Sequence, residues 1–237
     1  MDVSDLNSQL AEVLESASRL QRIVPDAVLV GGSAAALYAR HRISYDHDHV
    51  LSDLRDRFDV VLDALDREPD WVMNRVTPGK IILGSLGDIE AGVRQLRRHR
   101  PLELEVVDLP SGSTVRVPTF DETLRIKAFL IVKRNQVREY LDVAALSDSM
   151  GSDAAARVLR CIDEYYADES RNGPTVATQV VRQLGDPRPK DTRTLDDLPR
   201  YKGLTDRWQD WDAVRAQCSL VAAHVLDDNE ATEEADD

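Results

Sequence analysis

The stretch VGGSAAALYARHRISYDHDHVL (residues 30–51) decides the fold. An apolar run, DAVLV, leads into it and is stopped by Gly31 and Gly32, which indicates a short strand that ends in a tight turn. Ser33 then opens an alanine-rich segment and is a good helix N-cap, so a helix is expected over residues 33–42. The local order is therefore strand, glycine turn, helix.

A second strand is expected over residues 43–51, and it carries Asp46 and Asp48. Side chains alternate faces along a strand, so the two aspartates share one face while His47 and His49 share the other. Two neighbouring carboxylates repel each other unless a cation neutralises them, and carboxylate oxygens completed by substrate phosphates suit Mg²⁺. We therefore expect Asp46 and Asp48 to bind a divalent metal, Mg²⁺ or Mn²⁺.

The glycine turn is a candidate phosphate site. Free N–H groups and the dipole at the start of a helix favour an anion, and glycines allow the anion to approach the backbone. Gly31, Gly32 and Ser33 are therefore expected to bind nucleotide phosphates. A phosphate site beside a metal-binding carboxylate pair is what attack on a nucleoside triphosphate requires.

The composition is typical of a globular protein. The chain has 237 residues, of which 42% are hydrophobic and 31% are charged. It contains no apolar stretch long enough to span a bilayer and no secretory signal, so a cytoplasmic location and no membrane partner are expected. Cys161 and Cys218 lie far apart without metal-ligand spacing, which argues against a disulfide framework and against a zinc site.

Charge is distributed unevenly along the chain. The net charge of -13 opposes nonspecific attraction to nucleic acid. Residues 227–237 carry only acidic charges and are expected to form a disordered tail. Two clusters of basic residues are nevertheless consistent with a local positively charged pocket. They are Arg94, Arg97, Arg98, His99 and Arg100, then Arg125, Lys127, Lys133, Arg134 and Arg138.

The remaining pattern predicts an α/β (α+β) fold with a helical C-terminal region. Further helices are expected over residues 4–23, 53–67, 89–99, 120–135, 137–150, 152–167, 174–185 and 205–226. A strand is expected over 80–86, and a hairpin pairs 102–109 with 114–118. These elements assign residues 1–118 to a core domain, 119–226 to a helical domain and 227–237 to the tail.

Glycine-glycine-serine, a helix and D-x-D on a strand, in this order, resemble the signature of the nucleotidyltransferase-fold superfamily. The resemblance implies a mixed sheet flanked by helices. That superfamily typically supplies a third carboxylate from a later strand, and LELEVVDL offers Glu103 and Glu105 on one face, of which Glu105 is preferred as a metal ligand. His47 departs from the resemblance, because the superfamily usually has an apolar residue there. A histidine at this position indicates a partly open or hydrogen-bonded strand face.

The stretch KAFLIVKRNQVREYLDVAAL (residues 127–146) is similar to a helical motif of the AbiEii/AbiGii group, nucleotidyltransferase-like toxins of type IV toxin-antitoxin systems that include the MenT toxins. Lys127, Arg134, Arg138 and Asp142 fall on matching positions, whereas Glu139 replaces the usual aspartate. Their spacing places the four residues on one stripe if the helix is unbroken. The resemblance implies that Lys127 holds the triphosphate, beside Arg134 and Arg138, and that Asp142 acts in catalysis. By its chemistry alone, Asp142 is either a general base or a residue that orients a lysine or arginine.

The resemblance implies a Mg²⁺-dependent transfer of a nucleoside monophosphate from an NTP to an acceptor hydroxyl. For a toxin of this group, the acceptor is expected to be the 3′ end of tRNA, and the protein partner a cognate antitoxin. Two alternatives stay open: a transferase that acts on a small molecule or a protein hydroxyl, and a nucleotide-binding regulatory module whose catalytic site has decayed. The sequence leaves the nucleotide and the oligomeric state open.

Overall fold

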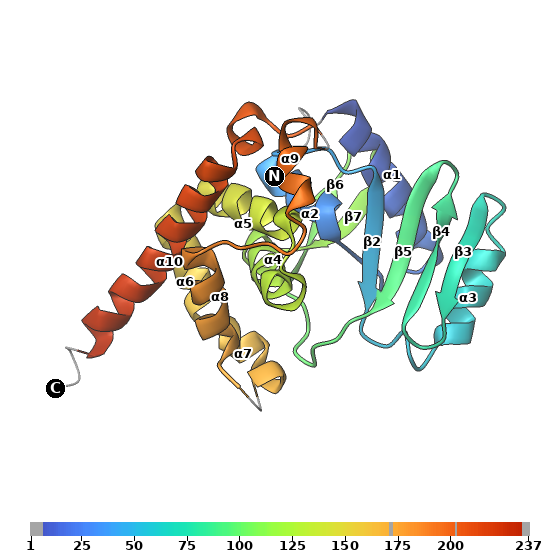
Figure 1. The fold of residues 1–237 in the computed structure, drawn as a ribbon. Coiled ribbons are helices and arrows are strands. Elements are labelled where there is room, and N and C mark those ends of the chain that lie inside the picture. The colour runs from blue at the N-terminus through green and yellow to red at the C-terminus, as the bar shows by residue number, and fades with distance from the viewer. Residues whose placement is uncertain (1–6, 171–172, 202, 234–237) are drawn as a thin grey trace. The chain divides into compact units, whose positions relative to one another are not determined.

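The chain divides into two compact units in a computed structural model (Figure 1). The structure describes residues 7–170, 173–201 and 203–233. The first unit comprises the chain up to Leu37 together with Ile43–Thr119, and the second comprises Tyr38–Arg42 together with the chain from Phe120 onward. Helix α2 (Gly31–Ala39) therefore begins in the first unit and ends in the second.

A five-stranded mixed sheet forms the centre of the first unit, with strand order β1-β2-β5-β4-β3. Its strands are β1 (Val28–Val30), β2 (Asp46–Leu51), β3 (Trp71–Thr77), β4 (Ile81–Leu86) and β5 (Ile89–Gln95). Strands β2 and β5 are parallel, whereas the other neighbours are antiparallel. The predicted mixed α/β architecture is confirmed.

Strand β5 corrects the helix predicted over residues 89–99. Gly87, with a φ of +62°, forms the tight turn after β4, and the two strands pair from Leu86 opposite Ile89 onward. The pairing buries Ala91 and Val93, which alternate along the strand. In a short run with few apolar residues, the hydrophobic pattern does not distinguish the two-residue period of a strand from the 3.6-residue period of a helix. The Gly-Asp pair before it, a two-residue hairpin turn, is the signal in the sequence that indicates a strand.

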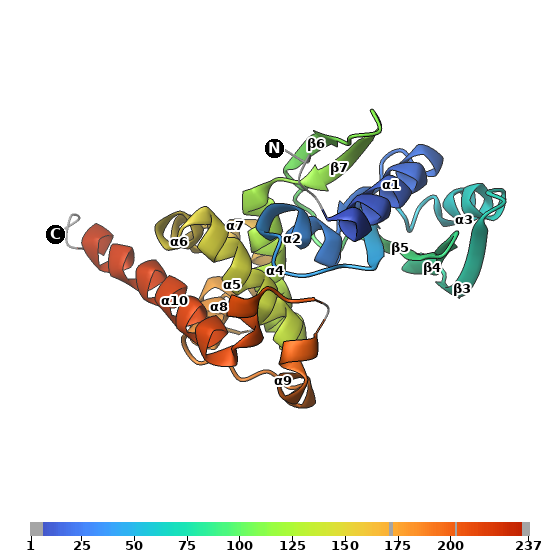
Figure 2. The same cartoon turned by 90° about the horizontal axis from the view of Figure 1, so that it is seen from above.

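Helices α1 (Ser8–Ile23) and α3 (Phe58–Asp66) complete this unit together with the hairpin of β6 (Leu104–Asp108) and β7 (Thr114–Pro118). Residues 4–6 of the predicted first helix lie outside the described residues. Strand β7 contacts α1, and Figure 2 shows the hairpin beside that helix. Strands β6 and β7 pair only with each other, as a separate two-stranded sheet.

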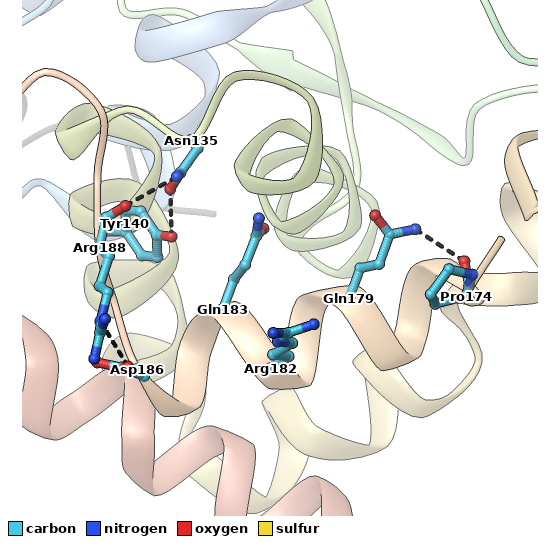
Figure 3. Close-up of a pocket in the computed structure, with 8 residues that line it drawn as sticks. All are labelled: Asn135, Tyr140, Pro174, Gln179, Arg182, Gln183, Asp186 and Arg188. Atoms are coloured by element: carbon cyan, nitrogen blue, oxygen red, sulfur yellow. Dashed lines mark hydrogen bonds and ion pairs between the residues drawn. The ribbon is translucent and has the colours of Figure 1, made fainter.

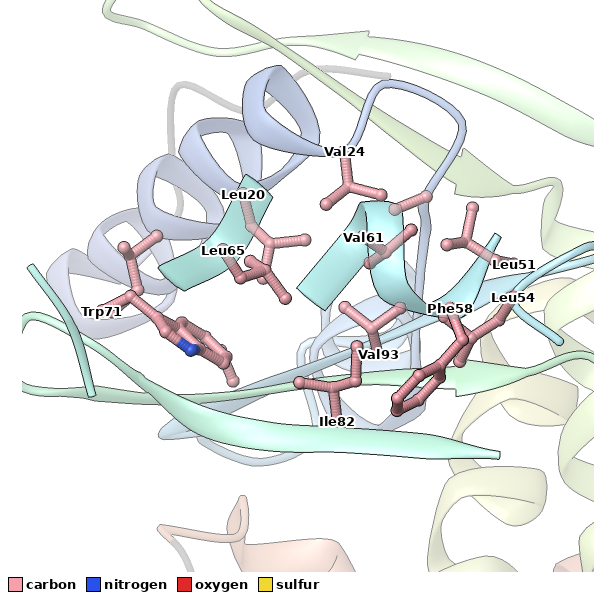
Figure 4. Packing of buried hydrophobic residues seen from close by; sticks show 13 residues of the cluster. Leu20, Val24, Leu51, Leu54, Phe58, Val61, Leu65, Trp71, Ile82 and Val93 are labelled. Atoms are coloured by element: carbon pink, nitrogen blue, oxygen red, sulfur yellow. The ribbon is translucent and has the colours of Figure 1, made fainter. Parts of the chain in front are cut away.

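Apolar side chains from α1 and α3 pack against one face of the five-stranded sheet (Figure 4). Leu20 and Leu65 come from the helices, whereas Leu51, Ile82 and Val93 come from the strands, and all five are almost completely buried. Burial of this kind contributes about 1.5–3 kcal/mol for each large apolar side chain. Because this face is occupied by the core, side chains on the opposite face of β2 and β5 are available for chemistry.

The second unit is helical. Its helices after α2 are α4 (Phe120–Arg134), α5 (Val137–Met150), α6 (Ser152–Arg160), α7 (Ile162–Tyr165), α8 (Val176–Gly185), α9 (Arg193–Asp196) and α10 (Trp211–Glu233). Short 3₁₀ segments, η1 (Ala167–Ser170), η2 (Leu198–Arg200) and η3 (Asp206–Gln209), join them. None of the helices in the described part of the chain combines the length and the apolar character needed to cross a bilayer.

Two details of this unit bear on the sequence-based expectations. Helices α4 and α5 are separated at Asn135, whose φ is +49°, so one unbroken helical stripe does not exist. Asparagine tolerates this left-handed conformation better than most residues. Helix α10 extends to Glu233, into the segment expected to be a disordered tail, while residues 234–237 lie outside the described residues.

Gly84 provides a test of the sheet packing. A Cβ there would lie 2.5 Å from the Cζ2 atom of Trp71 and 2.5 Å from the backbone oxygen of Val72. The backbone oxygen has no freedom to move aside, so we expect Gly84→Ala to lower the free energy of unfolding by about 1–3 kcal/mol, measured by urea denaturation. Ser85→Ala, on the opposite strand face, is the control and is expected to change it by less than about 0.5 kcal/mol. Equal effects of the two variants would contradict this packing.

Candidate functional site

Asp46 and Asp48 lie on one face of β2, as predicted from strand alternation. Both residues are half-buried, whereas His47 and His49 on the other face are buried. The aspartates therefore face away from the hydrophobic core. Their carboxylates remain partly accessible to a ligand.

The glycine turn adjoins Asp48. Gly31 has a φ of +80°, and a Cβ there would lie 3.5 Å from the Cβ of Asp48 and 3.6 Å from its Oδ2 atom. Antiparallel pairing places Val30 directly opposite Asp48. The two distances to Asp48 are ordinary van der Waals contacts, so the left-handed backbone is what favours glycine at position 31. The start of α2 and the carboxylate pair thus lie side by side.

Ser33 has a different role from the predicted helix cap. Helix α2 already begins at Gly31, so Ser33 lies inside the first turn. Its hydroxyl is buried and donates a hydrogen bond to the backbone oxygen of Asp46, at 2.5 Å. This bond fixes the helix to the strand at the point where the D-x-D pair begins.

Strand β5 adds residues that sequence reasoning did not assign to the site. Its register places Glu90 beside Asp46 and Gly92 beside Asp48. Arg94 follows on the same face, and its Nε atom donates to the Oδ1 atom of Asp48 at 3.1 Å. Since residues 89–99 were expected to be helical, the sequence pattern gave no reason to place these side chains next to β2.

The carboxylate pair fits a hard divalent cation such as Mg²⁺. Two aspartates on one strand face offer oxygen ligands, and Mg²⁺ usually takes one or two carboxylates plus water and substrate phosphates. Asp46 accepts a hydrogen bond from the hydroxyl of Ser44 at 3.1 Å, which orients its carboxylate. Within the described residues no group of three or more His, Cys, Asp or Glu side chains is placed to hold a metal ion.

The third carboxylate stays a prediction. Glu105 lies on β6, half-buried and paired with Val117 of β7, in a different sheet from Asp46 and Asp48. Glu103 precedes β6 in the chain. The five-stranded sheet itself therefore supplies two of the three expected metal ligands.

A buried charge cluster lies in the second unit, centred on Asp142. This carboxylate has no exposed side-chain surface. Lys127 approaches it at 2.6 Å, His41 at 2.7 Å, and the guanidinium of Arg42 donates at 2.8 and 3.2 Å. Lys127 and Asp142 are therefore brought together, although by the turn between α4 and α5 and not by a continuous helix. His41 and Arg42 belong to the same cluster and carried no separate signal in the sequence.

The cluster keeps Asp142 ionised. Burial alone would raise the pKa of this carboxyl, but the charges of Arg42 and Lys127 and the hydrogen bond from His41 hold it well below its usual range. Burial lowers the pKa of His41, so a neutral imidazole donates from Nε2. An ionised, fully buried carboxylate with cations around it is a poor proton acceptor and a good orienting group.

Glu139 extends the cluster toward solvent. Its buried carboxylate accepts from Arg134 and Arg138, both at 3.1 Å, and lies 3.8 Å from Lys127. The two arginine side chains remain 42% and 46% exposed. Glu139 therefore holds two half-exposed guanidinium groups.

A cavity of about 430 Å³ is also found in the second unit (Figure 3). It is lined by Asn135, Tyr140, Pro174, Gln179, Arg182, Gln183, Asp186 and Arg188. The lining contains none of the predicted site residues. The hydroxyl of Tyr140 donates to Asn135 at 2.6 Å, so part of the polar lining is already satisfied.

Comparison with known proteins gives relatives in sequence and in structure. No family model matches the chain. It is 31% identical over 236 residues to the heme uptake protein MmpL11 of Mycobacterium tuberculosis, a match that covers 91% of this chain and 23% of that protein. It is 34% identical over 180 residues to the mycolic acid-containing lipids exporter MmpL11 of Mycolicibacterium smegmatis, covering 76% of this chain and 16% of that protein. The chain thus spans less than a quarter of the length of these relatives.

The structural comparison shows the fold. A crystal structure from H. pylori described as a nucleotidyltransferase superposes with a TM-score of 0.52 and 15% sequence identity. The superposition covers 96% of this chain and 99% of that one. The chain therefore has a nucleotidyltransferase fold.

Removing the charge of Asp142 tests the buried cluster. Asp142→Asn leaves Lys127 and Arg42 buried beside a neutral amide, so we expect the free energy of unfolding to fall by about 3–5 kcal/mol. Asp148→Asn is a control on the same helix, because Asp148 pairs with Arg207 at the surface, and its effect is expected to stay below about 1 kcal/mol. Urea denaturation measures both. A loss for Asp142→Asn no larger than that of the control would be inconsistent with the cluster.

His47 predicts a pH dependence of stability. It is buried against Ser16, whose hydroxyl lies 3.0 Å from Nε2, and burial lowers its pKa to about 4. The unfolded chain binds a proton near pH 6.5 and the folded chain does not, so stability is full above pH 6.5 and is lost as the pH falls toward 4. We expect this histidine to account for a loss on the order of 3 kcal/mol. Urea denaturation between pH 7.5 and 4.5 measures it, and His47→Gln should flatten the slope; an unchanged slope would contradict the assignment.

Proposed function

We propose that the protein is a Mg²⁺-dependent nucleotidyltransferase that moves a nucleoside monophosphate from an NTP to an acceptor hydroxyl and releases pyrophosphate. One observation carries the proposal. The start of α2 at Gly31 adjoins the carboxylate of Asp48, with Asp46 on the same strand face. An anion site and a cation site that lie next to each other suit a metal-bound triphosphate.

The first unit supplies binding and orientation. Asp46 and Asp48 would hold the metal ion, which supplies Lewis-acid stabilisation of the charge that develops on the phosphates. The backbone N–H groups of Gly31, Gly32 and Ser33 would receive the terminal phosphates, because the first turn of a helix leaves its N–H groups unpaired. The bond from Ser33 to the backbone of Asp46 keeps the two binding elements in register.

The second unit supplies positive charge. Four cations, Lys127, Arg42, Arg134 and Arg138, bind the two carboxylates of Asp142 and Glu139, which leaves an excess of two positive charges in a chain of net charge -13. We infer that Lys127 neutralises charge on the triphosphate and that Asp142 orients the ammonium group of Lys127. Arg134 and Arg138, half-exposed, would bind phosphate groups of the nucleotide or of the acceptor.

The acceptor follows from the resemblance to the AbiEii/AbiGii group. We propose a toxin of a type IV toxin-antitoxin system that acts in the cytoplasm on the 3′ end of tRNA and is restrained by a cognate antitoxin. The AbiEii-like positions of Lys127, Arg134, Arg138 and Asp142 support this assignment. A small-molecule or protein hydroxyl is the alternative acceptor for the same chemistry.

A second function, nucleotide-binding regulatory module, is favoured by two observations. The match to MmpL11 covers 91% of this chain but 23% of that protein, so a segment of similar sequence occurs within a much larger transport protein. In addition, Arg94 donates a hydrogen bond to the Oδ1 atom of Asp48, an oxygen that a catalytic metal ion would need. In this second proposal the chain binds a nucleotide and signals to a transport protein without transferring a phosphate group.

Transfer assays separate these functions. Each α-labelled NTP is incubated with the protein, Mg²⁺ and total RNA, and label in tRNA is the expected result. Asp48→Asn is expected to reduce incorporation by at least about a hundredfold, because the metal loses a carboxylate ligand and its charge stabilisation. Asp53→Asn, a surface acid that pairs with Arg57, is the matched control and should retain activity.

The other outcomes also discriminate. Label in a protein or in a small molecule redirects the acceptor assignment. If no NTP gives incorporation with any acceptor while nucleotide still binds, the regulatory module is supported and the transferase is excluded. Growth arrest on expression that Asp48→Asn relieves would support a toxin.

A further inference from the structure

Arg94 is the one cation bonded to Asp48 among the residues that the structure describes. Strand β5 runs parallel to β2 with Gly92 beside Asp48, so Arg94 lies on the same face two residues further along. The side chains of Arg94 and Asp48 are 39% and 35% exposed. Neither partner is locked in place by burial, so the ion pair can open at a modest cost.

Gly92 makes room for this contact. A Cβ at position 92 would lie 2.8 Å from the Oδ1 atom of Asp48 and 2.8 Å from the Cδ2 atom of Leu83. The Oδ1 atom therefore lies over the backbone of β5, on the side of Arg94, while Oδ2 lies on the side of Gly31. The carboxylate of Asp48 thus has one oxygen toward the glycine turn and one toward the guanidinium.

The charges of the carboxylate pair are only partly balanced by Arg94. Asp46 is hydrogen-bonded to Ser44 and has no cation within ion-pair distance among the described residues. Two carboxylates on one strand face repel each other, so a positive charge at Asp48 stabilises the empty pair. A guanidinium keeps its charge at every physiological pH and binds carboxylate and phosphate with the same planar fork.

We propose that Arg94 is the counter-ion of the D-x-D pair before substrate binds, and that it exchanges Asp48 for a phosphate of the nucleotide when metal and nucleotide bind together. This inference rests on the proposed function. A metal ion alone must compete with the guanidinium of Arg94 for the Oδ1 atom of Asp48. A metal-nucleotide complex also brings a phosphate, to which the displaced guanidinium can bind. Metal and nucleotide therefore raise each other's affinity, as linkage requires.

Two binding measurements test the exchange. The first uses Mn²⁺ alone, followed by the electron paramagnetic resonance of the free ion. Arg94→Gln removes the competitor and is expected to bind Mn²⁺ about two- to fivefold more tightly than the wild type. Arg97→Gln is the matched control, an exposed arginine on the same segment, and should leave the Kd for Mn²⁺ unchanged.

The second measurement uses inorganic triphosphate in excess Mg²⁺, followed by calorimetry. Arg94→Gln is expected to weaken triphosphate binding at least about tenfold, because a charge-assisted hydrogen bond is lost. Arg94→Lys keeps the charge and is expected to hold Mn²⁺ affinity near that of the wild type. Circular dichroism and thermal unfolding confirm that each variant is folded, and Arg94→Met, which also removes the charge, serves for both measurements if the glutamine variant does not fold.

The outcomes separate this inference from the proposed function. An unchanged or weaker Kd for Mn²⁺ in Arg94→Gln overturns the competition, even if the wild type transfers nucleotides. Tighter Mn²⁺ binding with unchanged triphosphate binding overturns the exchange and leaves Arg94 as a fixed counter-ion. If the wild type neither binds Mn²⁺ nor transfers a nucleotide, the proposed function fails and the exchange fails with it.

Discussion

The contact between the glycine turn and Asp48 is the constraint on which the candidate site depends. The backbone at Gly31 is left-handed and lies where a larger residue would meet the aspartate, and Gly92 removes a second side chain from the other side of the same carboxylate. Asp48 therefore fills space that the missing side chain of Gly92 leaves open, beside the left-handed turn at Gly31. A side chain at position 92 would displace the Oδ1 atom of Asp48, and a residue other than glycine at position 31 would strain the left-handed turn at the start of α2.

In the second unit, the corresponding constraint is the buried charge of Asp142. Asp142 is fully buried, and ionisation in such a place is tolerated only because Arg42, Lys127 and His41 bind it. A buried ion network of this kind contributes more to the geometry of its members than to net stability. It fixes the ammonium of Lys127, while Glu139 presents two guanidinium groups closer to solvent. An acidic protein thereby retains a compact region of positive charge.

The structural neighbour and the sequence relatives are described in two different ways. The H. pylori structure that superposes on this chain is described as a nucleotidyltransferase. The MmpL11 proteins match at higher sequence identity, over a small part of their own length. A fold alone does not determine which chemistry a site performs. The carboxylate pair, the ion pair of Arg94 with Asp48 and the buried cluster of Asp142 are therefore the features on which a choice between transfer and regulation depends.

The sequence by itself determined the local arrangement. Alternation along a strand placed Asp46 and Asp48 on one face, and the glycine pair predicted the turn before α2, because both depend only on the geometry of neighbouring residues. The tertiary structure alone decided that residues 89–95 pair beside β2 and bring Arg94 to Asp48, and that a break at Asn135 brings Lys127 against Asp142. It also drew His41 and Arg42 to that carboxylate. Strand register and the packing of helices join residues that are far apart in the chain, and a local hydrophobic pattern carries no information on which of these long-range pairings has the lowest free energy.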